Sequence, residues 1–417
     1  MSRINELYSD LQQEVLRFSV NNDFFMLINH GAKRSGKTII DNDLFLLELK
    51  RVRKVADAQG VALPQYILAG ADLSAIRRNV LNELTNKYGI EFHFDKSNRF
   101  NLFGVLVCCF GHSKINDLGR IRGMTAYGAY INEATVANES VFDEIKSRCS
   151  APGARIIMDT NPDRPGHWLK RDYVDKADGK TIAQFHWRLT DNTFLTQRYI
   201  DSIKASTPSG VFYERDINGA WVAAEGVVYP DFNREVHYIT EDEVPTADIV
   251  KIWAGMDFGW EHFGALVLIA EADNGCLYLV KEYSSQHMNV DKWIEIIKRI
   301  EDKLSYNLRV YCDSARPDII NDLQCAGIDA KNAHKDVVAG IGEVATRFKN
   351  RTLYVVKENI KRFDEEIDAY AWKDGADEPV KINDDVMDAL RYAVYSEKVE
   401  REEAAELNDA VYLRKGW

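Results

Sequence analysis

One short glycine-rich stretch strongly limits what this chain can fold into. Residues 31–38 read Gly-Ala-Lys-Arg-Ser-Gly-Lys-Thr, the pattern G-x-x-x-x-G-K-T of a phosphate-binding P-loop. The apolar residues 24–28 before it predict a buried strand, and residues 39–49 after it are apolar at helical spacing. In such a context, backbone N–H groups and the positive end of the helix face phosphate oxygens. A glycine turn that matches by accident is the alternative, and the correct flanks argue against it.

The loop predicts roles for its own residues. Gly31 and Gly36 let backbone N–H groups turn toward phosphate oxygens, and Ser35 belongs to the same cradle. Lys37 is expected to reach the β- and γ-phosphates, and the Thr38 hydroxyl is expected to hold Mg²⁺.

The chain then alternates short apolar strands with helical segments, which predicts a mostly parallel sheet. Such strands are predicted at residues 65–70, 127–131 and 154–158. The second of them ends in Asn132 and Glu133. A carboxylate at such a strand end can orient and deprotonate an attacking water in a nucleoside triphosphatase, which makes Glu133 a candidate catalytic base. An ordinary strand end with a surface glutamate is the alternative.

The third of these strands runs into Asp-Thr-Asn-Pro at residues 159–162. Small polar groups at this place, here Thr160 and Asn161, can sense hydrolysis beside the γ-phosphate. The spacing alone is a weak signal, because Asn-Pro is also a common turn.

The second half of the chain carries acids where apolar strands end and where a late helix begins. Asp257 and Asp313 follow predicted strands, and Asp385 and Asp388 lie three residues apart on one helical face. Carboxylates brought together in this way repel one another unless divalent cations neutralise them, which is the arrangement for two-metal phosphodiester hydrolysis. A hairpin meander, a helix, a strand and a late helix favour a ribonuclease-H-like fold. The alternative is that these aspartates are helix caps and exposed strand ends.

Composition restricts the class of protein further. The 417 residues allow two domains, 46% of them are hydrophobic, and no run approaches the ~20 apolar residues of a membrane span. Neither a signal peptide nor a C-x-x-C pair is present, so a reducing cytosol is the expected compartment. The net charge of −12 argues against coating nucleic acid through bulk charge, but it does not exclude a DNA enzyme with local basic patches.

From about residue 24 to residue 396 the chain resembles the large subunit of tailed-phage terminases, the family of DNA-packaging motors. The resemblance rests on the P-loop and on the segments 131–134, 159–162, 191–200, 219–230, 256–259 and 383–392. It implies an α/β protein: a P-loop ATPase domain over 1–190, a linker region over 191–245 and a ribonuclease-H-like nuclease domain over 246–398. A charged tail over 399–417 would follow, solvated or frayed, with docking on the portal as the alternative.

The resemblance also implies roles for individual residues. The residues that it assigns to nucleotide binding are Gly31, Ser35, Gly36, Lys37, Thr38, Asn132, Thr160 and Asn161. Glu133 would be the catalytic carboxylate, and Asn132 replaces the more common aspartate beside it. The family's cis-acting arginine position holds Lys33, with Arg34 next to it, and the sequence leaves open which of the two acts.

For the nuclease, the resemblance assigns the metal-binding and catalytic roles to Asp257, Asp313 and Asp388. Asp385 stands where related sequences often carry histidine, so its role as a metal ligand is left open. Mg²⁺ is the expected cation, with Mn²⁺ able to substitute in the nuclease site.

The implied function is viral DNA packaging in the cytoplasm of an infected bacterium. ATP hydrolysis would move double-stranded DNA through the portal, and the nuclease would cut concatemeric DNA at the start and end of packaging. The implied partners are the DNA, the portal protein, the terminase small subunit and further copies in a ring, with a monomer expected for the isolated chain and no membrane contact. Two alternatives remain: a P-loop helicase fused to a nuclease, and an assembly protein whose degenerate ATP site, marked by Asn132, does not turn over.

Overall fold

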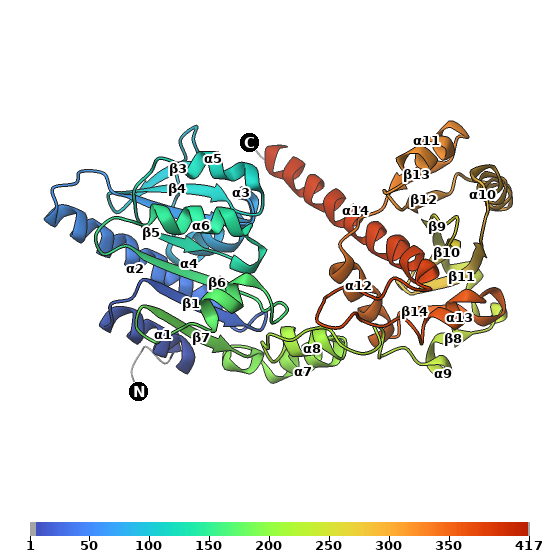
Figure 1. Ribbon diagram of the computed structural model, residues 1–417, viewed down its shortest axis with the longest axis horizontal. Coiled ribbons are helices and arrows are strands. Elements are labelled where there is room, and N and C mark those ends of the chain that lie inside the picture. Colours follow the sequence, from blue (N-terminus) through green and yellow to red (C-terminus); the bar gives the residue numbers. More distant parts are fainter. Residues whose placement is uncertain (1–5, 416–417) are drawn as a thin grey trace. The chain divides into compact units, whose positions relative to one another are not determined.

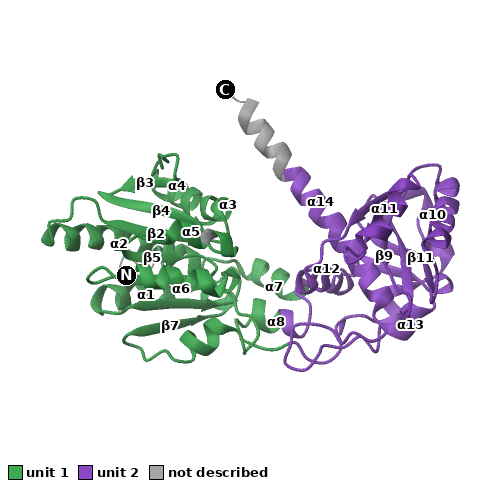
Figure 2. Cartoon of the chain, turned by 45° about the horizontal axis from the view of Figure 1, so that its top comes forward, with its two compact units in different colours: residues 1–205, 213–223 green, residues 206–212, 224–417 purple. Residues whose placement is uncertain are grey.

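The computed structural model describes residues 6–415, with side chains described up to residue 405 except at position 117. The chain forms two compact units (Figure 2). Unit 1 contains the residues up to Ala205 and Tyr213–Ala223, and unit 2 contains Ser206–Phe212 and the residues from Ala224 onward. The chain therefore passes between the units more than once.

Unit 1 is built on a seven-stranded sheet in the order β3-β4-β2-β5-β6-β1-β7. Its strands are β1 (Met26–Gly31), β2 (Gln65–Gly70), β3 (Arg99–Leu102), β4 (Val105–Gly111), β5 (Ala126–Ile131), β6 (Arg155–Thr160) and β7 (Ile182–Trp187). All neighbours pair in parallel except the hairpin of β3 and β4. The P-loop strand β1 lies between β6 and β7, so their carboxyl ends lie beside the loop (Figure 1).

Helices cover both faces of this sheet. They are α1 (Asp10–Asn21), α2 (Lys37–Ala58), α3 (Leu73–Ile76), α4 (Asn82–Tyr88), α5 (Leu118–Ile121) and α6 (Glu139–Arg148). Two more helices, α7 (Gln197–Ser206) and α8 (Val211–Asp216), follow the last strand, and Ile200 of α7 packs in a smaller cluster with Ala32 and Leu189. Successive strand residues point to opposite faces, so Leu27 packs in the cluster with α1 and α2, whereas Met26 and Ile28 pack with α6. This double cover explains why the strands read as continuous apolar runs.

Unit 2 contains a second seven-stranded sheet, in the order β13-β12-β9-β10-β11-β14-β8. Its strands are β8 (Tyr238–Ile239), β9 (Ile249–Asp257), β10 (Gly264–Ala272), β11 (Leu277–Ser285), β12 (Arg309–Cys312), β13 (Asp329–Asn332) and β14 (Leu353–Val356). β9, β10 and β11 form an antiparallel meander, and β12 pairs in parallel with β9. The turn between β10 and β11 is at Asn274 and Gly275, as the hairpin signal predicts.

The helices of unit 2 also divide between two faces of their sheet. They are α9 (Arg234–His237), α10 (Val290–Leu304), α11 (Pro317–Cys325), α12 (Val337–Lys349), α13 (Arg362–Glu366) and α14 (Asp385–Lys415). α10 and α11 pack in one apolar cluster, and α12, α13 and α14 pack in the other. The predicted fold class is confirmed: a P-loop ATPase fold with a mostly parallel sheet precedes a ribonuclease-H-like fold. The domain boundaries at 190, 245 and 398 stay predictions.

Two local expectations from the sequence are corrected. The sequence pattern of residues 191–205 predicts a helix from residue 191, but α7 starts only at Gln197, after a separate turn in which Asp191 accepts the Arg188 N–H at 2.7 Å. The charged tail from residue 399 continues α14 as far as Lys415, and its last two residues, 416–417, lie outside the described residues. Glu400 forms ion pairs with Arg309 at 2.7 Å and with Lys331 at 3.0 Å, so the tail's first turn packs on the sheet.

No helix within residues 6–415 is both long enough and apolar enough to span a bilayer.

α14 packs tightly on its sheet at Gly255 of β9. A Cβ atom there would lie 2.0 Å from the carbonyl oxygen of Ala389 and 2.7 Å from the amide nitrogen of Ala393.

Gly255→Ala is therefore expected to destabilise unit 2 by at least about 1–3 kcal/mol, because a rigid helix backbone must shift. Calorimetric unfolding measures this loss. Gly166→Ala is the matched control, since no atom lies within 4 Å of its added Cβ. Equal unfolding of the two variants would contradict the packing argument.

Candidate functional site

The P-loop connects β1 to α2 and is held by backbone packing against β7. The Ala32 N–H donates to the carbonyl oxygen of Trp187 at 2.8 Å. A Cβ at Gly31 would lie 2.0 Å from that same oxygen, so this position requires glycine. Gly36 has φ of 96°, in the left-handed region, and α2 begins directly after it at Lys37. The sequence pattern and the local geometry agree on a phosphate-binding loop.

Lys37 lies inside the loop with only 5% of its surface exposed. Its ammonium donates to the carbonyl oxygens of Gly31 at 2.8 Å and Ala32 at 2.6 Å, and to the Asn161 side chain at 3.3 Å. Burial lowers the pKa of Lys37 to about 8, and the negative charge of Asp159 opposes that shift. A phosphate that enters the loop would offer the Lys37 ammonium a negatively charged acceptor in place of these neutral carbonyl oxygens. Hydrogen bonds between charged groups are stronger, which favours phosphate binding.

The carboxylate of Asp159 at the end of β6 lies at the centre of the site. Its Oδ2 accepts the hydroxyl of Thr38, and its Oδ1 accepts the Asn132 amide at 2.9 Å and the Glu133 N–H at 3.0 Å. Asp159 is 2% exposed. The sequence singled out its neighbours Thr160 and Asn161 but not Asp159 itself. The one feature of the sequence that could have indicated a functional role for Asp159 is its position near the end of a predicted buried strand.

Glu133 follows β5 in a left-handed conformation, with φ of 58°. Such a backbone is uncommon for glutamate, and strain of this kind concentrates at functional sites. Burial, and then repulsion from Asp159, raises the pKa of Glu133, while Arg78 and Lys37 oppose the rise. A carboxylate with a raised pKa beside a P-loop is suited to accept a proton from water.

Thr160 and Asn161 have different surroundings, although they are neighbours in the chain. Asn161 reaches the Lys37 ammonium. The Thr160 hydroxyl accepts the Thr135 N–H at 2.9 Å and contacts the Thr135 hydroxyl at 2.7 Å. The end of β6 therefore links the phosphate-binding lysine to the turn that follows Glu133.

The two basic residues at the start of the loop also differ. The Lys33 ammonium forms an ion pair with Asp216 of α8 at 2.9 Å. Arg34 is exposed, and its carbonyl oxygen accepts the Asn192 side-chain amide at 2.8 Å. Lys33 is thus directed toward α8, whereas the Arg34 guanidinium forms no hydrogen bond or ion pair with the residues that the structure describes.

The segment after α8 packs directly on the P-loop. A Cβ at Gly219 would lie 2.2 Å from the Trp187 carbonyl oxygen and 2.9 Å from the Cα of Gly31. The Trp221 indole N–H donates to His30 Nδ1 at 3.0 Å. These contacts explain the glycine and tryptophan of the segment 219–230, and they tie that segment to the strand that carries the P-loop.

In unit 2 the sheet and α14 bring the predicted acids together. β12 pairs beside β9, and the Asp313 N–H donates to the Met256 carbonyl at 3.0 Å, which places Asp313 next to the end of β9 at Asp257. Burial, and then repulsion from Asp388, Asp313 and Asp385, raises the pKa of Asp257 well above its ordinary value. Asp384 contributes to the same repulsion, and the sequence interpretation missed it.

A buried glutamate fixes the start of the helix that carries two of these acids. Glu366 accepts the N–H groups of Val386 at 2.9 Å and Met387 at 3.2 Å, in the first turn of α14. Its side chain is fully buried. It therefore replaces a conventional N-cap and sets the position of Asp388 against the sheet.

Basic side chains partly neutralise the acids. Lys381 bridges Asp388 at 2.8 Å and Asp384 at 3.2 Å, and Lys335 pairs with Asp313 at 2.6 Å. Burial favours protonation of Asp388, but Arg391 and Lys381 outweigh it and lower its pKa.

Among the described residues no three His, Cys, Asp or Glu side chains converge tightly enough to hold one ion. The donor chemistry nevertheless fits a divalent cation, because clustered carboxylates with a raised pKa favour added positive charge. Asp385 lies on the rim of this cluster, 3.9 Å from Arg362.

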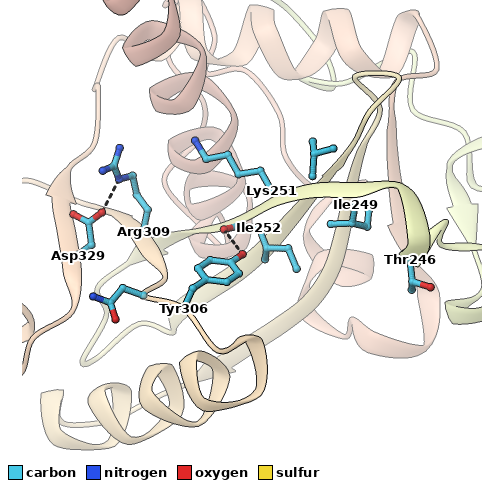
Figure 3. A pocket seen from close by; sticks show the side chains of 9 residues that line it. Thr246, Ile249, Lys251, Ile252, Tyr306, Arg309 and Asp329 are labelled. Atoms are coloured by element: carbon cyan, nitrogen blue, oxygen red, sulfur yellow. Dashed lines mark hydrogen bonds and ion pairs between the residues drawn. The ribbon is translucent and has the colours of Figure 1, made fainter.

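A cavity of about 690 Å³ in unit 2 is lined by Ile249, Tyr306, Arg309 and their neighbours, and none of the clustered acids lines it (Figure 3). It opens at the start of β9 near Ile249, whereas Asp257 ends that strand. Its polar side chains already have partners: Tyr306 donates to the Ile252 carbonyl at 3.0 Å, and Arg309 pairs with Asp329 at 2.8 Å. It carries no cluster of catalytic groups.

Comparisons with known proteins give the same two-part organisation. Residues 31–236 match the family model for the N-terminal part of the T4-like-virus type of terminase large subunit. A crystal structure of the large terminase from the thermophilic bacteriophage D6E is similar at 27% identity, with a TM-score of 0.78, over 93% of this chain and 98% of that one. The same phage protein in complex with ATP-γ-S is similar at 27% identity, with a TM-score of 0.75, over 93% and 99% of the two chains. No curated protein sequence matches.

The fold and the two sites define a protein that joins a P-loop ATPase fold to a ribonuclease-H-like fold. The match reaches across both units and spans nearly the whole of the similar phage protein. In its N-terminal half by the family model, and across both units by structure, the chain is similar to phage terminase large subunits.

The repulsion in unit 2 has a measurable effect on stability. Asp257→Asn is expected to raise the midpoint of thermal unfolding in EDTA, because the folded protein disfavours the ionised form of this buried group. Functional sites commonly carry such a cost. Asp273→Asn, at an exposed aspartate of the same unit, is the control and is expected to unfold like the wild type. A lower midpoint for Asp257→Asn would contradict a repulsive cluster.

Proposed function

We propose that this chain is the motor and nuclease subunit of a viral DNA-packaging machine. ATP hydrolysis in unit 1 drives double-stranded DNA through the portal into the procapsid, and unit 2 cuts concatemeric DNA at the start and end of packaging. The observation that carries the proposal is the presence, in one chain, of a P-loop with Glu133 at a neighbouring strand end and an acid cluster around Asp257.

The nucleotide chemistry follows from the residues around the loop. Lys37 and the backbone of the loop bind the ATP phosphates, and Thr38 presents its hydroxyl to Mg²⁺. The cation neutralises charge on the β- and γ-phosphates when it is bound. Glu133 orients the attacking water and accepts its proton. Asn161 contacts Lys37, so the loss of the γ-phosphate changes this contact, and the resulting shift is transmitted to β6.

Coupling to movement uses the segment that packs on the P-loop. Gly219 and Trp221 contact the end of β7 and the strand β1, so a shift of the loop displaces the segment that continues toward unit 2. Such close backbone packing transmits small shifts, because packed interiors do not deform continuously.

We assign the nuclease chemistry to Asp257, Asp313 and Asp388, with Asp385 at the rim. These carboxylates would hold Mg²⁺ or Mn²⁺, and bound cations stabilise the attacking and leaving oxygens of a phosphodiester. Lys381 and Lys335 balance the charge of the cluster while no cation is bound.

The proposed partners are the viral DNA, the portal protein, the terminase small subunit and further copies of this chain in a ring. A ring also accounts for the net charge of −12, since only its channel needs to be basic. The proposed domain boundaries are residues 190, 245 and 398.

The ATPase assignment predicts different effects for Glu133 and Lys37. Glu133→Gln is expected to lower kcat by about 10²–10⁴-fold and to leave nucleotide affinity unchanged, because only the proton acceptor is lost. Lys37→Ala is expected to lose nucleotide binding as well. Phosphate release and nucleotide titration measure both effects. Equal phosphate release by Lys37→Ala and the wild type would contradict the motor and favour an assembly protein without turnover.

The pH dependence of hydrolysis gives a further readout of the same base. Because the pKa of Glu133 is raised, kcat is expected to fall as the pH drops through a value above that of an ordinary glutamate. The ionised form accepts the proton, so activity lies on the alkaline side of this pKa.

We assign the cis-acting cation to Arg34, because Lys33 is engaged by Asp216. Arg34→Ala is expected to lower kcat by about 10³-fold or more, as the loss of an arginine finger does. Lys33→Ala is the matched neighbour and is expected to keep kcat within about tenfold of the wild type. Steady-state ATPase rates of the two variants measure this difference. A larger loss of kcat in Lys33→Ala than in Arg34→Ala would contradict the assignment.

The nuclease assignment predicts cleavage of plasmid DNA that requires Mg²⁺ or Mn²⁺. Asp257→Ala is expected to abolish cleavage, because it removes a central carboxylate of the cluster. Asp273→Ala is expected to cleave like the wild type, and gel electrophoresis of the plasmid measures both. Cleavage that persists with purified Asp257→Ala would mean that the acids are structural.

A further inference from the structure

Asn132 occupies the strand end from which a carboxylate commonly reaches the cation of a P-loop enzyme. Both polar atoms of its side chain are already engaged. The amide nitrogen donates to the two oxygens of Asp159 at 2.9 and 3.2 Å, and the amide oxygen accepts the Asn79 amide at 3.0 Å. Asn132 is 1% exposed. The oxygen of this residue is therefore directed to Asn79 and not to the loop.

Asp159 presents a carboxylate to the loop from the neighbouring strand. Ile131 of β5 lies in register with Met158 of β6, so residue 159 is the next step along the sheet, beside residue 132. The Thr38 hydroxyl donates to Asp159 Oδ2. A hydroxyl that donates its proton in this way keeps its oxygen lone pairs available for a cation.

The surroundings of Asp159 are those of an ionised group. Three donors reach it: the Thr38 hydroxyl, the Asn132 amide and the Glu133 N–H. A buried carboxylate persists as an anion only with such compensation. The same carboxylate accepts the Glu133 N–H, so it also fixes the backbone of the residue that is proposed to activate water.

We propose that Asp159, and not residue 132, is the anionic partner of the divalent cation that binds with ATP. In this chain the carboxylate stands at the end of β6, whereas P-loop enzymes commonly carry it at the strand end that Asn132 occupies. The Asn132 side chain orients the Asp159 carboxylate. This inference rests on the proposed ATPase function and names the residue that completes its metal site.

The test compares nucleotide affinity with and without the cation. ATP-γ-S is titrated into the full chain by calorimetry, in Mg²⁺ and in EDTA, and Mn²⁺ binding to the nucleotide-loaded protein is followed by electron paramagnetic resonance. For the wild type, Mg²⁺ is expected to tighten nucleotide binding. Asp159→Asn is expected to weaken Mn²⁺ affinity by about 10–100-fold and to lose the Mg²⁺ effect, while affinity in EDTA is kept.

A buried carboxylate of the same pocket supplies the matched control. Asp41 of α2 is fully buried and accepts the Asn29 amide at 2.6 Å, and burial, then repulsion from Asp159, raises its pKa. Asp41→Asn is expected to leave Mn²⁺ affinity unchanged. An equal loss in both variants would overturn the inference, because it would reflect a general disturbance of the buried polar groups near the loop and not the loss of a cation ligand.

A double variant moves the carboxylate back to β5. Asn132→Asp combined with Asp159→Asn is expected to recover part of the Mn²⁺ affinity, and it decides the question if Asp159→Asn alone does not fold. Full Mn²⁺ affinity in folded Asp159→Asn, or no recovery in the folded double variant, would overturn the assignment. Wild-type protein that binds ATP-γ-S no more tightly in Mg²⁺ than in EDTA would instead contradict the ATPase proposal itself.

Discussion

The ATPase half of this protein depends on one buried carboxylate. Asp159 joins the P-loop at Thr38, the end of β5 at Asn132 and the backbone of Glu133. Each of these contacts replaces water that the carboxylate loses on burial, so the anion and its donors stabilise one another. The P-loop, the backbone of Glu133 and the strand end beside Lys37 therefore form one connected arrangement, and the proposed motor would need such a connection if hydrolysis at one point is to move another.

Unit 2 differs from unit 1, because its clustered aspartates have too few hydrogen-bond donors and basic side chains around them to offset their repulsion. Four aspartates repel Asp257, and Lys381, Lys335 and Arg391 compensate only part of the charge of this cluster. The fold keeps this cluster in place through Glu366, which caps α14, and through the close contact of α14 with Gly255. A site that is costly without cations and rigidly supported is well suited to bind them.

The sequence predicted the features that depend on local patterns. The P-loop follows from its motif, and the strands β2, β5 and β6 follow from short apolar runs. Features that depend on pairing between distant segments were missed. Asp159 and Asp384 carry no motif of their own, and their roles emerge only once β6 lies beside β5 and α14 packs on β9. The tail was interpreted as a solvated or frayed end; no local pattern reveals that Glu400 pairs with Arg309 and Lys331, because those residues lie about 70 to 90 positions away.

The division of labour between the two units is the central claim, and packaging itself tests it most directly. Procapsids that carry the cognate portal are mixed with linear double-stranded DNA and ATP, and the DNA protected from DNase is measured. Protein with Asp257→Asn is expected to protect linear DNA as the wild type does, because translocation needs only the ATPase of unit 1, whereas it should fail to start on circular DNA, which must first be cut. Protection that is independent of ATP, or that starts equally well on circular DNA with Asp257→Asn, would contradict the account.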